Sequence, residues 1–121
     1  MNKGILKDKS FKFAVRIVNL YKYLCEELKE FILSKQVLRS GTSVGAMIRE
    51  AEHSESIPDF IHKMAIAQKE INETIYWLEL LVETEYISNK EFESINADAT
   101  EVIKMITSSI KTAKSKLITN H

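Results

Sequence analysis

The sequence has 121 residues, which is enough for one domain with a substantial core, and neither an internal repeat nor a shift in composition divides it. Three glycines, one proline and no alternating runs of β-branched residues favour an all-helical protein over any sheet. Lysine and arginine together number 17, as do aspartate and glutamate, so the chain lacks the positive excess typical of a dedicated nucleic-acid binder.

The composition also indicates in which cellular compartment the protein resides. Cys25 is the single cysteine, so it has no partner for an internal disulfide and is read as a small core residue. Charged residues between Lys3 and Lys9 interrupt any hydrophobic run of the kind found in secretory signals, and no stretch approaches the length of a membrane span. We therefore expect a cytoplasmic protein without membrane association, with residues 1–121 forming a single domain.

The first predicted helix covers residues 10–32, after a frayed start over residues 1–9. Its apolar residues recur every three or four positions in two rows. The main row is Phe11, Ala14, Val18, Tyr21, Cys25, Leu28 and Ile32, and the second is Phe13, Ile17, Leu20, Leu24 and Phe31. Ser34 is predicted to cap the next helix, because its hydroxyl can accept an unpaired backbone N–H of the first turn. The short turn makes the two helices antiparallel neighbours.

The second predicted helix covers residues 35–54 and contains two glycines, Gly41 and Gly45, four positions apart. A glycine inside a helix costs up to about 1 kcal/mol relative to alanine, so two of them predict a strip where a neighbouring backbone packs closely. The surrounding sequence SGTSVG does not indicate a phosphate loop, since no strand precedes it and no GK[ST] ending follows.

The third predicted helix, residues 58–84, is apolar over more than half of its circumference. Pro58 suits its first turn, after a capping residue at Ser56 or Ile57. One face carries Ile57, Phe60, Ile61, Met64, Ala67, Ile71, Ile75, Leu78 and Val82 at helical spacing. We expect this face to close the core against Gly41 and Gly45. The remaining apolar flank, Ile66, Tyr76 and Leu80, is predicted to meet another subunit.

The fourth predicted helix covers residues 89–117. Ser88 and Glu91 have the S-x-x-E spacing of a capping box. An unbroken apolar stripe follows, made of Phe92, Ile95, Ala99, Val102, Ile106, Ile110, Ala113 and Leu117. Four helices with short connections predict an antiparallel up-down-up-down four-helix bundle.

Two segments of the chain carry a family resemblance. The run LRSGTSVGA at residues 38–46, followed by Ile48, Glu50 and Ala51, and the run NETIYWLELL at residues 72–81 with Asp59 and Phe60 upstream, resemble the four-helix bundle or 23S ribosomal RNA intervening-sequence protein family. The resemblance covers roughly residues 10–117. It implies an antiparallel bundle that assembles into a ring-like homopentamer without known enzymatic activity.

The same superfamily includes the accessory variability determinant of diversity-generating retroelements, which binds nucleic acid and a reverse transcriptase. That branch is markedly basic, whereas this chain is neutral. The family commonly has an asparagine two residues after the second glycine, where this chain has Met47. The neutral charge therefore argues against transferring the nucleic-acid role of that branch, and Met47 cannot supply the polar contact of the asparagine.

Polar residues beside the apolar rows have structural and chemical interpretations. Ser43, Glu50 and Glu73 are expected to pair with Arg39, Arg49 or a hydroxyl, because an unpaired buried carboxylate is costly. Glu50–His53 and Asp59–His62 each have the i, i+3 spacing used by di-iron bundles. Both pairs lie near a predicted turn, away from the middle of a bundle, which favours solvated or capping roles. We therefore expect neither a metal nor a cofactor, and a di-iron-like bundle or an enzyme is the alternative.

Charges are predicted to segregate between the two ends of the bundle. One end gathers Lys7, Lys9, Lys12, Arg16, Lys111, Lys114 and Lys116, and the other gathers Glu26, Glu27, Glu30, Glu79, Glu83, Glu85, Glu91 and Glu93. The basic end, repeated round a ring, could attract RNA or DNA phosphates. The simpler interpretation is a set of solvated tails, offset by the nearby acidic residues Glu50, Glu52, Glu55 and Asp59. No aromatic residue is interleaved with the lysines to stack bases. The sequence thus predicts a non-enzymatic homo-oligomeric scaffold or binding module, with nucleic acid as its leading partner.

Overall fold

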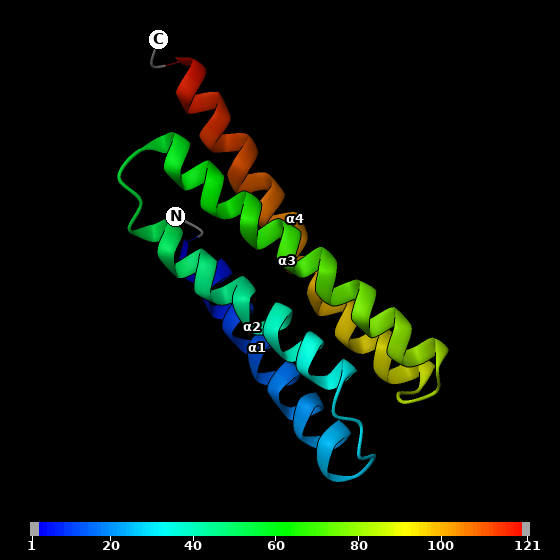
Figure 1. Cartoon of the computed structure of the whole chain (residues 1–121). Coiled ribbons are helices and arrows are strands. Elements are labelled where there is room, and N and C mark those ends of the chain that lie inside the picture. Colours follow the sequence, from blue (N-terminus) through cyan, green and yellow to red (C-terminus); the bar gives the residue numbers. More distant parts are fainter. Residues whose placement is uncertain (1–2, 120–121) are drawn as a thin grey trace.

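The computed structural model describes residues 3–119, which form four α-helices and no strand. The helices are α1 (Lys3–Glu26), α2 (Leu33–Glu52), α3 (Ile57–Glu83) and α4 (Asn89–Thr119). Consecutive helices run in opposite directions (Figure 1). α2 packs against α1 and α3, α3 packs against α4, and α1 contacts α4 least. The predicted all-α class and the four helices are confirmed.

The core is made by one face of each helix. Its most completely buried large side chains are Phe13, Ile17, Leu24, Val37, Val44, Met64, Ile71, Leu78, Leu81, Val102 and Ile106. The apolar face predicted for α3 and the stripe predicted for α4 therefore lie where their periodicity placed them. For α1, Phe13, Ile17, Leu20 and Leu24 of the second predicted row line the core, whereas Phe31 of that row lies beyond the helix and is 51% exposed. Phe11 and Ile32 of the other row are exposed, at 53% and 73%.

Both limits of α1 differ from the prediction. The helix begins at Lys3, so the frayed start expected over residues 1–9 is wrong from residue 3 onward, and residues 1–2 lie outside the described part. It ends at Glu26, because the chain turns at Lys29, whose φ of 55° is left-handed and incompatible with a continuing helix. The N–H of Glu30 then donates to the carbonyl of Leu24 at 2.9 Å, which closes the turn.

The N-terminus of α2 is capped by Glu30, whereas the prediction that Ser34 caps this helix is wrong. The Glu30 carboxylate accepts the backbone N–H groups of Ile32, Leu33 and Ser34 at 3.2, 3.0 and 2.7 Å. Burial opposes ionisation of this carboxyl, but the three N–H donors favour the charged form more strongly, so the pKa of Glu30 falls below its ordinary value. Ser34 itself is fully buried inside the helix.

The caps predicted for α3 and α4 are confirmed. The Ser56 hydroxyl accepts the N–H of Asp59 at 3.1 Å, and Pro58 lies in the first turn. Ser88 and Glu91 form a reciprocal capping box, in which the Ser88 N–H donates to Glu91 Oε1 at 2.9 Å and the Glu91 N–H donates to Ser88 Oγ at 3.1 Å.

The two glycines of α2 face α1, so the expectation that α3 would cover them is wrong. A Cβ built on Gly41 would lie 2.8 Å from both Cγ1 and Cγ2 of Ile17. A Cβ on Gly45 would lie 3.5 Å from the Ser10 carbonyl oxygen and from Ser10 Oγ, which is an ordinary contact distance. Close approach therefore depends on Gly41 alone.

Candidate nucleic-acid interface

The start of α1, the turn between α2 and α3, and the end of α4 lie at the same end of the molecule (Figure 1). We call this end, with its residues Lys7, Lys111, Lys114 and Lys116, the basic end. These four lysines are exposed and form no ion pair with any residue of the described part. The solvent-facing surfaces of α1 and α4 at this end therefore carry positive charge that no carboxylate among residues 3–119 neutralises.

The three other predicted cationic residues are paired with carboxylates. Lys9 Nζ lies 2.8 Å from Glu101 Oε1, and Arg16 Nη1 lies 2.8 Å from Asp98 Oδ2, so both residues tie α1 to α4. Lys12 pairs with Asp8 one turn earlier at 3.2 Å. The hydrogen bond to Glu101 raises the pKa of Lys9 above its ordinary value. Sequence reasoning missed the two interhelical pairs because their members are 92 and 82 positions apart.

The opposite end carries the predicted acidic residues, and all of them except Glu30 are exposed. Glu26, Glu27, Glu79, Glu83, Glu85, Glu91 and Glu93 are exposed. Glu30 is 8% exposed because it caps α2. The neutral chain therefore has two ends of opposite charge.

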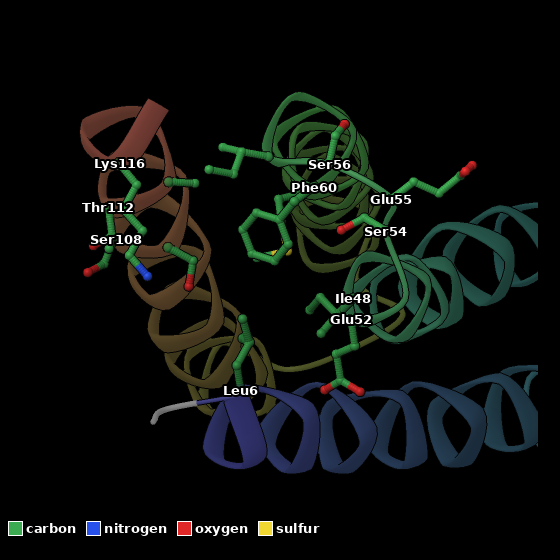
Figure 2. A pocket seen from close by; sticks show the side chains of 14 residues that line it. Leu6, Ile48, Glu52, Ser54, Glu55, Ser56, Phe60, Ser108, Thr112 and Lys116 are labelled. Carbon is green, nitrogen blue, oxygen red and sulfur yellow. The ribbon is translucent and has the colours of Figure 1, made fainter. Parts of the chain in front are cut away.

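A cleft of about 630 Å³ opens at the basic end between α3 and the last turns of α4 (Figure 2). Its floor is apolar and consists of Leu6, Ile48, Met64 and Ala113, and the half-buried Ile57 and Phe60 of α3 complete the apolar lining. Its rim carries polar groups from two sides, Glu52, Ser54, Glu55 and Ser56 around the α2–α3 turn and Ser108, Ser109, Thr112 and Lys116 on α4. Sequence reasoning did not predict this cleft, because its walls come from all four helices.

The predicted oligomer residues on α3 differ in exposure. Tyr76 is 55% exposed, and its ring meets the ring of Trp77 edge to face, with centroids 5.0 Å apart. Ile66 and Leu80 are half-buried. Large apolar side chains are also exposed on α1, where Phe11 lies beneath the Arg49 guanidinium, 5.4 Å from ring centroid to Cζ, and Val15 follows one turn later.

A polar network joins α2 to α3. Arg39 pairs with Glu73 and, at 3.2 Å, with Glu70, while Trp77 Nε1 donates to Glu73 at 3.2 Å. Of the partners expected for these carboxylates, Arg39, Arg49 or a hydroxyl, the structure gives Arg39 to Glu73. Glu50 is exposed and makes no such pair within the described residues. The hydroxyl of Ser43 donates to the Arg39 carbonyl at 2.6 Å.

A second polar contact between these helices is fully buried and was not predicted. Thr74 Oγ1 donates to Ser40 Oγ at 2.8 Å, and Ser40 in turn donates to the Gln36 carbonyl at 3.1 Å. Serine and threonine at helical spacing commonly bond their own backbone, so a sequence signal for this contact is weak.

The two pairs with di-iron spacing do not converge. Glu50 and His53 are both exposed. Asp59 accepts the N–H of Glu55 at 3.2 Å and the ammonium of Lys63 at 3.3 Å, and these two contacts lower the pKa of Asp59. Over the described residues, no group of three or more histidine, cysteine, aspartate or glutamate side chains is placed to hold a metal ion.

Comparison with known proteins places this bundle in a family. The family model described as 23S rRNA-intervening sequence protein matches residues 3–108. The chain belongs to this family. A crystal structure of a Bacteroides thetaiotaomicron protein of the S23 ribosomal protein family, described as having unknown function, is 62% identical, with a TM-score of 0.90 over 92% of this chain and 99% of that chain. No curated protein matches the sequence.

The resemblance drawn from LRSGTSVGA and NETIYWLELL is thereby confirmed, and both segments lie within the part of the chain that the family model matches. In the structure they meet where α2 packs on α3, since Arg39 binds Glu73 and Ser40 binds Thr74. None of the helices in the described part is sufficiently long and apolar to cross a membrane.

Proposed function

We propose that this protein is a non-enzymatic, homo-oligomeric bundle that binds nucleic acid through its basic end. The observation that best supports nucleic-acid binding is a set of four exposed lysines without a carboxylate partner among the described residues. They are Lys7, Lys111, Lys114 and Lys116. A lysine or arginine that already pairs with a carboxylate gains little free energy by binding a phosphate, because it must first give up that partner. Unpaired lysines instead displace the counterions of the nucleic acid, and this drives binding.

Assembly is supported by the exposed apolar side chains. Tyr76 and the half-buried Leu80 lie on one outer face of α3, whereas Phe11 and Val15 lie on the outer face of α1. Two distinct apolar faces suit a head-to-tail interface that closes into a ring. The family resemblance implies a homopentamer. A closed ring would bring several basic ends to one side and so increase the apparent affinity for a single strand.

The assembly is tested by Tyr76→Glu. A carboxylate at this exposed position leaves the bundle core untouched but opposes burial against a second subunit. We expect a smaller mass by light scattering with unchanged helical content by circular dichroism. Thr100→Glu, which adds the same charge at an exposed site on α4, is the matched control and should keep the wild-type mass. A wild-type protein that is monomeric at tens of micromolar would refute the assembly.

Nucleic-acid binding is tested by fluorescence anisotropy with a single-stranded RNA of about 20 nucleotides, over about 50 to 200 mM salt. We expect affinity to fall steeply with salt, and the double variant Lys111→Glu/Lys114→Glu to weaken binding and reduce the salt slope. The double variant Lys35→Glu/Lys90→Glu makes the same change in charge at the acidic end and should have little effect. The absence of binding at the lowest salt, or equal loss in the control variant, would contradict the proposal.

A further inference from the structure

We propose that the cleft at the basic end is a nucleotide-binding site that accepts an unpaired guanine base from a bound strand. The inference rests on the proposed binding of nucleic acid and specifies what the strand inserts. It brings together three features that line the cleft from three different helices: an aromatic ring on α3, an unpaired carboxylate on α2, and a wall of hydroxyls on α4 that ends in a lysine (Figure 2).

The size and floor of the cleft suit a flat base. Its volume of about 630 Å³ lies within the range of small-molecule sites in proteins, about 300 to 1,000 Å³. Leu6, Ile48 and Met64 are almost fully buried beneath it, so the floor is preformed. The ring of Phe60 is half-buried and stands in the opening (Figure 2). A nucleobase can stack on such a ring, a contact that any base can make.

Glu52 supplies the contact that would select the base. It lies on the last turn of α2 at the edge of the opening, is half-buried, and has no hydrogen-bond or ion-pair partner within the described residues (Figure 2). The side chain of Glu55 points away from the opening (Figure 2). An ionised carboxylate only accepts hydrogen bonds, so Glu52 requires a ligand that presents donors. Guanine presents two neighbouring donors, N1–H and the N2 amino group. Adenine presents an acceptor, N1, beside its amino donor.

The α4 wall supplies the contacts for the rest of a nucleotide. Ser109, Thr112 and Lys116 line it, and Lys116 is exposed at the rim near the end of the helix. Hydroxyls and an ammonium group are donors for phosphate and ribose oxygens. A fatty acid would bring its carboxylate to Lys116 and leave Glu52 without a donor, and a cationic amphiphile would leave Lys116 without a partner. A nucleotide is the ligand that uses the apolar floor, Glu52 and Lys116 together.

The test is isothermal titration calorimetry of the full chain with guanosine 5′-monophosphate, adenosine 5′-monophosphate and guanosine. We expect the guanine nucleotide to bind about tenfold more tightly than the adenine nucleotide. This factor corresponds to about 1.4 kcal/mol and is within the discrimination that a bidentate contact to a base edge provides. Glu52→Gln should abolish that preference, because an amide presents a donor as well as an acceptor. Phe60→Leu should weaken both nucleotides about equally.

Lys116→Met separates the phosphate contact from the base contact. It should weaken the nucleotide severalfold while leaving guanosine unchanged. Lys90→Met, at the other end of α4, is the matched control and should bind both ligands as wild type does. Absence of guanosine monophosphate binding at millimolar concentration would overturn the site. So would an unchanged preference in Glu52→Gln, provided that circular dichroism shows each variant folded.

A parallel titration with RNA separates this inference from the proposed function. Oligouridylate is compared with the same strand carrying one central guanine. If both RNAs bind equally and the free nucleotide does not bind, the basic end binds nucleic acid and the guanine site is wrong. If the nucleotide binds and neither RNA does, the cleft binds guanine nucleotides but takes no base from a strand, and the proposed function fails.

Discussion

The glycines of α2 allow one prediction to be developed from distances, because two identical substitutions on one helix should have opposite effects. Replacing glycine by alanine inside a helix stabilises it by about 1 kcal/mol through backbone entropy. At Gly45 the new methyl group would meet Ser10 at 3.5 Å, an ordinary contact. Gly45→Ala should therefore stabilise the protein by up to about 1 kcal/mol.

At Gly41 the same methyl group would lie 2.8 Å from two carbons of Ile17, a side chain with 0% exposure. Ile17 is β-branched and cannot move both γ carbons away by rotating χ1. Overpacking of this kind costs about 1 to 3 kcal/mol, which outweighs the gain in helix propensity. Gly41→Ala should therefore destabilise the protein by up to about 2 kcal/mol. Because the propensity gain is common to both variants, the difference between them, about 1 to 3 kcal/mol, measures the steric clash alone.

Urea unfolding followed by circular dichroism tests this pair, with all proteins at one concentration because assembly couples to stability. Ile17→Val provides a further check. Valine keeps both γ carbons of isoleucine, so it should not rescue Gly41→Ala and should add its own cost. Equal shifts of the unfolding midpoint in the two glycine variants, or rescue by Ile17→Val, would refute the reasoning.

Two further predictions concern buried polar contacts. Glu30→Gln should cost about 1 to 2 kcal/mol at neutral pH, because charge-assisted bonds to three backbone N–H groups become weaker bonds to a neutral amide. The folded pKa of Glu30 is lowered, so its stabilisation is complete above the unfolded value of 4.5 and is lost as pH falls through the lower folded pKa. The deficit of Glu30→Gln should therefore shrink in urea titrations below that value, and a deficit independent of pH would contradict the capping role. Ser40→Ala and Thr74→Val should each cost about 1 kcal/mol, and the double variant should cost less than their sum, since either substitution alone already removes the bond that the two hydroxyls share. Strict additivity in that double-mutant cycle would show that the 2.8 Å contact contributes nothing.

The helices themselves could be predicted from the sequence, because the signals involved are local. The apolar faces of α3 and α4, the Ser56 cap and the Ser88–Glu91 box each depend on residues within a few turns. The ends of α1 could not, since its C-terminus depends on the left-handed backbone at Lys29 and on a bond to Glu30. Glu30 resembles any other acidic residue until the turn brings it against three N–H groups.

The candidate site likewise has features that local sequence predicts and features that depend on tertiary packing. The sequence by itself determined an all-helical bundle, two ends of opposite charge and a family motif, because periodicity, helix direction and short turns fix these properties. Only the tertiary structure decided which cations remain free, since Lys9 and Arg16 meet carboxylates on a helix far along the chain. It also placed Phe60 and Lys116 in the lining of one cleft, which no spacing in the sequence indicates. Interhelical neighbours depend on how four faces pack together, and that arrangement is a property of the whole bundle.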